Sequence, residues 1–476
     1  MTKLLAFFFR PLIFFLRFLW DGSSPTIYGQ AKWMGRLQKW TVLSSRNKGL
    51  VLGPGRRLSL EESYKNLCLC SPTGGGKTTR FVIPNILQCT GSIVVTDPSG
   101  EIFQKTSGHM ADRGYLVQVL QTADLSKSLR FNPLEKFRSA QDCKRIATTL
   151  GQNNTGSDPF WTTGATHILY LGLLALTATV DDRLVHLGNV RILLNRIGTG
   201  GTGIQDFMRS RLDDIAYGEY QAFLEQDDKI IAGFLSTART ALDLWTDPDI
   251  VRFSASNSVS IEALRNRKTI IYLITPEAQI KYFSILLNLF YSACFEYCLQ
   301  QSGHPVFFIL DEFGNLGPIG TNFSAIITTL RKRQCSINII LQELAQLTAV
   351  YGPHEGRVIL SGGVGSKLFF SSMDIESCTY LERVLGRSTA QEKVQEGQAL
   401  TAGKPLMTSD QIRMMAAHEA ILISGSYPPM LLNMPPYFQD RAMKKKTQKP
   451  PAPLRIDYSS EKVVYLKIHN GEEGNP

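Results

Sequence analysis

The sequence predicts an α/β fold in which ligand-binding residues gather at one edge of a parallel sheet. The first observation is a glycine-rich run at residues 71–79 (SPTGGGKTT), between a short apolar strand at residues 67–70 and a helix. The second is a run of five apolar residues, 306–310, which ends in Asp311 and Glu312. Continuous apolar runs of this kind are typical of parallel strands that are buried on both faces. Polar residues at their carboxyl ends meet at the edge where α/β proteins bind ligands.

The glycine-rich run has the features of a phosphate-binding loop for ATP. Glycines let the backbone wrap closely around phosphates, and the N–H groups at the following helix start attract anionic oxygens. Lys77, on a loop expected to lie at the surface, would reach the β- and γ-phosphates, and the Thr78 hydroxyl would bind Mg²⁺. Ser71 stands where the usual pattern has Gly or Ala, and the alternative interpretation is a glycine-rich turn before a helix. The predicted nucleotide-binding residues are Thr73, Gly74, Gly75, Gly76, Lys77, Thr78 and Thr79.

The acidic pair Asp311-Glu312 is the predicted partner of this loop. Asp311 would hold Mg²⁺ together with Thr78, and Glu312 would polarise the water that attacks the γ-phosphate. An apolar run that ends in two acids also marks ordinary strands that enter a solvated loop. The combination with Lys77 and Thr78 favours a catalytic site.

A third strand, residues 336–341, ends in Gln342. At a strand end beside the metal-binding acid, this amide would sense the γ-phosphate or orient the water; the alternative is a strand cap that faces solvent. Arg331 precedes the same strand, in a basic stretch predicted to be helical. We interpret it either as an arginine finger that acts across a subunit boundary or as part of a solvated basic face.

Asp97 ends another predicted strand, residues 93–96. It would lie at the same edge of the sheet. It would then either approach the nucleotide and its metal or cap the next helix.

Further short motifs follow one another in a characteristic order over about residues 28–440. With the phosphate-binding loop they resemble the type IV secretion coupling proteins, the TraG-like conjugative ATPases related to the FtsK and HerA DNA motors. The set that includes DPxGE, FNPL and LDEF is much more specific than a phosphate-binding loop alone. The stretches are 28–33 (YGQAKW), 95–101 (VTDPSGE), 131–134 (FNPL), 158–161 (DPFW), 310–317 (LDEFGNLG), 341–347 (LQELAQL) and 423–425 (ISG).

The resemblance implies a RecA-like P-loop nucleotide-binding domain with an inserted all-α domain, and a homohexamer at the cytoplasmic face of the bacterial inner membrane. It implies an ATPase that uses ATP and Mg²⁺ and recruits a relaxase–DNA complex or an effector protein. Channel components of the secretion system and DNA, single- or double-stranded and without sequence specificity, are the other implied partners. The alternative is a nucleotide-regulated docking platform with little motor activity. The absence of an Asn-Lys-x-Asp motif disfavours a signalling GTPase.

Composition agrees with a globular body that meets acidic partners. The charged fraction is 19% and the hydrophobic fraction 43%, as in ordinary folded proteins, and 476 residues suffice for two or three domains. The net charge of +10 favours nucleic acid or an anionic membrane surface. The eight cysteines form no Cys-x-x-Cys pair and are expected to be reduced core thiols.

The amino-terminal segment is predicted to associate with a membrane. Residues 4–20 (LLAFFFRPLIFFLRFLW) are densely apolar but are interrupted by Arg10, Pro11 and Arg17. A spanning helix needs about 20 apolar residues, and a charge at the bilayer centre is costly. An interfacial position is therefore favoured over a full span, and a helix that packs on a partner protein is the remaining alternative.

Changes in pattern along the chain predict five regions. Residues 1–25 form the membrane-associated segment, and residues 26–159 the first part of the nucleotide-binding domain. Helical periodicity with few strand runs marks residues 160–258 as the all-α insertion. Residues 259–441 complete the nucleotide-binding domain. Residues 442–476 form a basic and proline-rich linker and tail, with one weak strand at 463–466.

Overall fold

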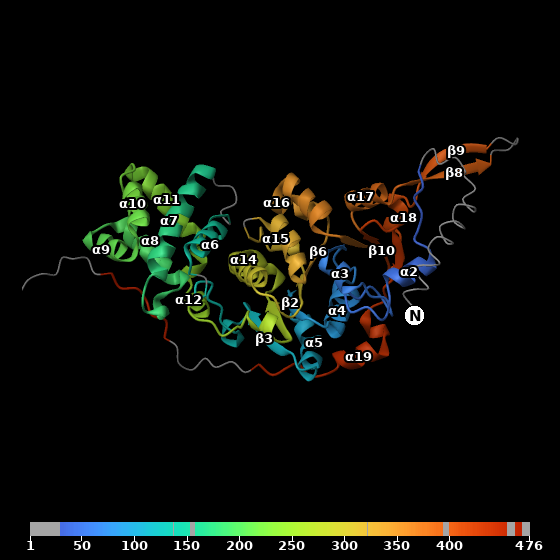
Figure 1. The fold of residues 1–476 in the computed structure, drawn as a ribbon, viewed down its shortest axis with the longest axis horizontal. Coiled ribbons are helices and arrows are strands. Elements are labelled where there is room, and N and C mark those ends of the chain that lie inside the picture. The colour runs from blue at the N-terminus through green and yellow to red at the C-terminus, as the bar shows by residue number, and fades with distance from the viewer. Residues whose placement is uncertain are drawn as a thin grey trace, which may run out of the picture.

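The computed structural model describes residues 29–136, 138–152, 158–320, 322–393, 399–454 and 462–468. The predicted membrane-associated segment, residues 1–25, lies outside the described residues. Figure 1 shows an elongated molecule with a helical block at one end, a central sheet, and a two-stranded hairpin at the other end. The hairpin consists of β8 (Arg387–Lys393) and β9 (Ala399–Pro405).

The central element is a nine-stranded sheet in the order β11-β10-β7-β1-β6-β5-β2-β4-β3. Seven strands are parallel, and the last two, β10 and β11, are antiparallel at one edge. The predicted strands form because their apolar runs are buried on both faces, as for the five residues of β5. The strands are β1 (Leu67–Cys70), β2 (Ser92–Asp97), β3 (Leu116–Gln121), β4 (Thr269–Ile274), β5 (Val306–Leu310), β6 (Cys335–Leu341), β7 (Ser366–Phe370), β10 (Glu419–Ser424) and β11 (Met430–Asn433).

Helices cover both faces of this sheet, and neighbouring residues of one strand enter different cores. On β2, Val95 packs with helices α4 and α5, whereas Val94 belongs to the core formed with α14 and α15. This alternation is the two-residue repeat of a strand that is covered on both sides. The helices around the sheet are α2 (Arg36–Val42), α3 (Leu60–Tyr64), α4 (Ile83–Gln88), α5 (Glu101–Asp112), α13 (Ala263–Asn266), α14 (Glu277–Gln300), α15 (Phe323–Leu330), α16 (Ala345–Val358), α17 (Ile375–Leu385), α18 (Ser409–Arg413) and α19 (Arg441–Thr447).

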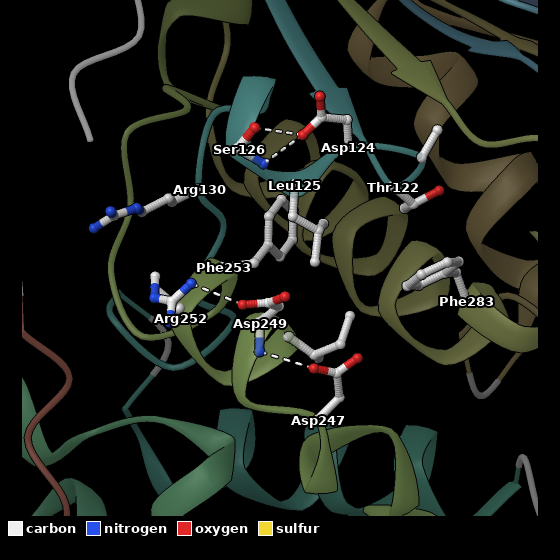
Figure 2. A pocket seen from close by; sticks show the side chains of 12 residues that line it. Thr122, Asp124, Leu125, Ser126, Arg130, Asp247, Asp249, Arg252, Phe253 and Phe283 are labelled. Carbon is white, nitrogen blue, oxygen red and sulfur yellow. Dashed lines mark hydrogen bonds and ion pairs between the residues drawn. The ribbon is translucent and has the colours of Figure 1, made fainter. Parts of the chain in front are cut away.

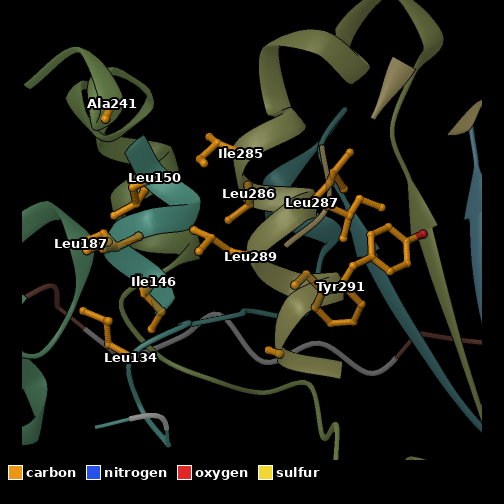
Figure 3. Packing of buried hydrophobic residues seen from close by; sticks show 14 of the residues in the cluster. Leu134, Ile146, Leu150, Leu187, Ala241, Ile285, Leu286, Leu287, Leu289 and Tyr291 are labelled. Carbon is orange, nitrogen blue, oxygen red and sulfur yellow. The ribbon is translucent and has the colours of Figure 1, made fainter. Parts of the chain in front are cut away.

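The chain between β3 and β4 forms the helical block, as predicted for an all-α insertion. The predicted start of the insertion, residue 160, falls inside α7. Helix α6 lies before this boundary but packs along α7, so it also belongs to the helical block. Figure 3 shows Ile146 and Leu150 of α6 facing Leu286 and Leu289 of α14, so one apolar core continues from the sheet into the insertion. The helices of the block are α6 (Ala140–Gln152), α7 (Pro159–Thr177), α8 (Leu187–Thr199), α9 (Thr202–Arg211), α10 (Asp214–Leu224), α11 (Asp228–Ala241) and α12 (Pro248–Phe253).

Helix α14 is the one helix, among the described residues, that is long and apolar enough to span a membrane. However, 72% of its most apolar stretch is buried inside the protein. It runs between the sheet and the insertion, and its composition is explained by that core position. All eight cysteines are also buried and free, as their scattered spacing predicts.

The described parts of the carboxyl-terminal tail pack on two different parts of the body. Helix α19 packs on α5, and the Ala452 N–H donates to Ser107 Oγ at 3.0 Å. Residues 463–466, predicted as a weak strand, form neither a strand nor a helix in the described part of the chain. Instead the Asn189 side chain of α8 donates to the Val464 carbonyl at 3.0 Å and accepts from the Leu466 N–H at 2.9 Å. These side-chain contacts satisfy the backbone groups that a neighbouring strand would otherwise pair.

Candidate nucleotide-binding site

The phosphate-binding loop follows β1, which lies between β6 and β7 near the middle of the sheet. The Ser71 N–H donates to the Leu341 carbonyl at 3.0 Å, so the loop starts at the carboxyl end of the neighbouring β6. Gly74 and Gly76 have φ angles of 76° and 84°, which L-residues with side chains rarely adopt. A Cβ at Gly75 would lie 2.3 Å from Ser71 Oγ. The chain therefore needs all three glycines to make this tight turn.

Arg80 anchors the end of the loop. Thr78–Val82 forms a π-helical turn before α4, a geometry found often at functional sites. Arg80 is buried there and donates to the carbonyls of Gly75 (3.1 Å), Met434 (2.8 Å) and Glu419 (2.8 Å). Its guanidinium lies 3.8 Å above the centre of the Phe370 ring. Sequence reasoning missed this residue, and its only signal was an arginine in the first turn of an otherwise apolar helix.

Three of the predicted catalytic residues lie in direct contact. Lys77 Nζ is 2.8 Å from Glu312 Oε1, and Gln342 Nε2 donates to Glu312 Oε2 at 2.8 Å. Lys77 is only 8% exposed, so it is a buried residue rather than the surface position expected from the sequence. The Glu312 carboxylate thus joins the phosphate-binding loop, the acidic strand and the third strand in one network.

Glu312 has a left-handed backbone conformation, with φ 55° and ψ 39°. This conformation is uncommon for a residue with a side chain and costs about 1–3 kcal/mol unless surrounding contacts hold it. Three hydrogen bonds hold Glu312 in this conformation. Two are made by its carboxylate, and in the third its own N–H donates to Asp311 Oδ1 at 3.1 Å. Strained residues of this kind concentrate at active sites, and this one lies at the predicted catalytic base.

Two buried carboxyl groups lie at the same edge of the sheet. Burial raises the pKa of Asp311 to about 6; nearby Lys77 lowers this pKa, and Glu312 raises it. Burial also raises the pKa of Asp97, on the adjacent strand β2, to about 6. Asp97 Oδ2 accepts from the Phe103 N–H of α5 at 2.8 Å, so the capping alternative holds for this oxygen. Its Oδ1 is buried without a hydrogen bond in the described structure.

This donor set fits a hard divalent cation bound together with a nucleotide. Carboxylate and hydroxyl oxygens are what Mg²⁺ prefers, and it usually takes only one or two carboxylates from the protein. Burial raises the pKa of Asp311 and so favours its neutral form, and a nearby cation would stabilise the charged form instead. Thr78 begins the π-helical turn beside Lys77. The described residues contain no cluster of three or more His, Cys, Asp or Glu that would hold a metal without further ligands.

The remaining predicted residues are divided between the loop and a distant edge. Thr73 and Gly74 are exposed at the loop tip, and Thr79 Oγ1 donates to the Gly76 carbonyl at 3.3 Å. Arg331 is exposed in a 3-10 turn, Arg331–Arg333, that precedes β6. Gln342 follows the same strand, so Arg331 lies at the opposite edge of the sheet from the network. The fold does not bring it to the site of its own chain, which leaves the arginine finger a hypothesis about a second subunit.

A cavity of about 620 Å³ lies away from this site, where β3 leaves the sheet beside α12 (Figure 2). Its three aspartates and Arg252 already have hydrogen-bond or ion-pair partners. Asp124 accepts from the Ser126 N–H at 3.1 Å, Asp247 accepts from the Asp249 N–H at 2.8 Å, and Arg252 pairs with Asp249 at 2.7 Å. The cavity presents few unpaired polar groups that would fix a ligand, despite its size.

The loop, the acidic pair and the parallel sheet define a P-loop nucleotide-binding protein of the α/β class. The chain belongs to the type IV secretory system conjugative DNA transfer family, which matches residues 35–456. The resemblance found in the motifs is therefore confirmed.

Two relatives and one solved structure are similar to this chain over most of its length. The chain is 26% identical to protein VirD4 of Rhizobium radiobacter, over 91% of this chain and 67% of VirD4. It is 25% identical to VirD4 of Agrobacterium fabrum strain C58, over 88% of this chain and 66% of that protein. It thus spans about two thirds of the length of these relatives. The structure of the bacterial conjugative coupling protein TrwB, without its first 70 residues and in complex with sulphate, superposes with a TM-score of 0.68 at 15% identity. This match covers 87% of this chain and 96% of the truncated TrwB chain, and it confirms the predicted RecA-like fold.

Proposed function

We propose that this protein is a type IV secretion coupling ATPase, which binds a transfer substrate and uses ATP hydrolysis to deliver it to the secretion channel. The observation that carries the proposal is the Lys77–Glu312–Gln342 network at the carboxyl edge of the sheet. ATP and Mg²⁺ are the proposed ligands. TrwB has been solved with ADP and Mg²⁺ and with a non-hydrolysable ATP analogue, which supports both for this chain.

In this proposal each residue of the network has a separate role. Lys77 leaves Glu312 and neutralises the phosphate oxygens, whereas Thr78 and Asp311 hold Mg²⁺, which supplies charge stabilisation when bound. Glu312, released from Lys77, accepts the proton of the attacking water. Gln342 keeps its contact with the Glu312 carboxylate and orients it toward the water. The γ-phosphate thereby competes with Glu312 for Lys77, so the base becomes free only when the nucleotide is in place.

The partners follow from the family and are part of the proposal. A relaxase–DNA complex or an effector protein is the cargo, and channel components, non-specifically bound DNA and the inner membrane complete the set. The net charge of +10 supports contact with DNA or anionic lipid. Assembly into a hexamer would bring Arg331 of one subunit to the site of the next.

The test is ATP hydrolysis by the purified full-length chain, measured with and without single-stranded DNA and accompanied by size measurement. A coupling motor should hydrolyse ATP only with Mg²⁺, and DNA should raise the rate and promote the larger assembly. A protein that binds ATP but does not turn it over under any of these conditions would instead be a docking platform.

A further inference from the structure

Helix α2 is attached to the edge of the sheet but buries none of its seven residues. The Met34 N–H just before it donates to the Pro429 carbonyl at 2.9 Å, and Lys39 Nζ donates to the Leu431 carbonyl at 3.0 Å. These two contacts hold α2 beside β11, at the same end of the molecule as the hairpin in Figure 1. Val42 at the end of the helix packs against the core, whereas two other apolar side chains of α2 remain outside it.

Leu37 and Trp40 are the apolar side chains that α2 exposes. They are 87% and 74% exposed, and residues three positions apart lie on the same side of a helix. Single exposed apolar residues are normal on protein surfaces, but a tryptophan and a leucine side by side on a fixed helix indicate a contact surface. Tryptophan in particular is enriched where protein meets the headgroup region of a membrane.

The chain segment that contains α2 carries charges of one sign only. Residues 22–60 contain seven Lys and Arg and no Asp or Glu. Three of these cations lie close together in the structure: the pKa of Lys39 is lowered by burial and then by the charges of Arg56 and Arg36. Because no carboxylate of this stretch neutralises them, they favour an anionic surface over a neutral or basic one.

We propose that α2 docks on an anionic bilayer, with Leu37 and Trp40 in the headgroup boundary and Arg36, Lys39 and Arg56 against lipid phosphates. The position of α2 in the chain supports this occupant. It begins sixteen residues after the apolar stretch 4–20, and that many extended residues span at most about 55 Å. The inference extends the membrane association proposed above, because it assigns a second membrane contact to the folded body and so fixes its orientation.

The test uses the full-length chain and vesicles of phosphatidylcholine with about one third phosphatidylglycerol, an anionic lipid. The test variant is Leu37→Ala with Trp40→Ala. The control is Val180→Ala with Ile215→Ala, which removes two side chains of similar exposure (91% and 81%) on the helical block. We expect the test variant to bind vesicles at least about tenfold more weakly, as the loss of two partly inserted side chains predicts, and the control to bind like wild type. Trp40→Phe should remove part of the blue shift of tryptophan emission on adding vesicles, and the shift that remains should come from Trp20 of the apolar stretch.

Each other outcome overturns the inference in a distinguishable way. If wild type and test variant bind vesicles equally, α2 is not a membrane contact, although the membrane association of residues 1–25 stands. If the test variant binds vesicles normally but loses self-association in sedimentation, the patch joins copies of the chain. If no form binds vesicles, the membrane association of the whole protein fails.

Discussion

Glu312→Gln is the sharpest test of the site, because Glu312 has two partners whose requirements differ. Its Oε1 accepts from Lys77 and its Oε2 from Gln342, each at 2.8 Å. A glutamine keeps the shape and one acceptor oxygen. However, its NH₂ group must face either an ammonium or an amide donor, so one of the two hydrogen bonds is lost and Lys77 loses its counter-charge.

Glu312→Gln is expected to change the rate of hydrolysis and the affinity for ATP in different ways. Removing a general base typically lowers the rate about 10²–10⁴-fold, which corresponds to roughly 3–5 kcal/mol of transition-state stabilisation. Removing one partner of a buried ion pair also destabilises a protein by about 3–5 kcal/mol. Because Glu312→Gln keeps one acceptor oxygen, we expect a loss of about 3 kcal/mol in the free energy of unfolding. Bound ATP would supply the missing negative charge to Lys77. The variant should therefore bind ATP at least as tightly as wild type, while its nucleotide-free form melts several degrees lower.

Three measurements check this reasoning. Phosphate release measures turnover, and titration calorimetry measures ATP affinity. Thermal melting with and without ATP measures how much of the lost stability ATP restores. Glu225→Gln, an exposed residue at the end of α10, is the matched control and should change none of them. Turnover within threefold of wild type, or ATP binding weakened as much as turnover, would refute the assignment of Glu312 as the base competing with phosphate for Lys77.

Three further predictions follow from the same geometry. Lys77→Ala should abolish hydrolysis and also lower the melting temperature, since it leaves Glu312 buried without its cation; unchanged turnover would remove Lys77 from the site. Asp311→Asn should raise the stability of the nucleotide-free protein by up to about 3 kcal/mol above pH 6, but not below pH 4, because burial raises the pKa of Asp311 from 3.8 to about 6. The stability that a raised carboxyl pKa contributes to the wild-type protein is present below pH 4 and is lost as the pH rises through 6. If melting curves from pH 4 to 8 show the same pH dependence for wild type and Asp311→Asn, the prediction is wrong. Deletion of residues 1–25 should release most of the protein from membrane fractions with ATP binding intact, because only the contact of α2 would remain. High salt should strip part of the full-length chain, whereas resistance to both salt and carbonate would indicate a spanning helix.

The sequence was sufficient to predict the fold and to place four site residues at one edge. Lys77, Asp311, Glu312 and Gln342 each follow an apolar run, and parallel strands end on the same side of their sheet. Strand order was not required for this deduction. The prediction succeeded because burial on both faces gives a strong local signal in three separate strands.

The contacts between these residues were not predictable, because they depend on segments far apart in the chain. Glu312 is 235 residues from Lys77, and it contacts Lys77 from a left-handed backbone conformation that carries no sequence signal. Arg80 contacts Met434, which is 354 residues away, through a backbone carbonyl that carries no sequence signal. Likewise, the tail segment 463–466 has strand-forming residues, and only the position of Asn189 makes it pair with side chains instead.

The site also connects to the surface of the protein through α16. The Gln342 N–H donates to Gln346 Oε1 at 2.9 Å, in the first turn of this helix. Directly after Glu312, Phe313 stacks on Tyr351 of the same helix, with ring centres 5.7 Å apart. A Cβ at Gly314 would lie 2.7 Å from the Gln346 side chain, so the two segments pack without spare room. The segments that follow Glu312 and Gln342 therefore pack on one shared helix. Tightly packed contacts transmit displacement rather than absorb it, so under the proposed mechanism a movement of Glu312 on ATP binding would be passed to α16.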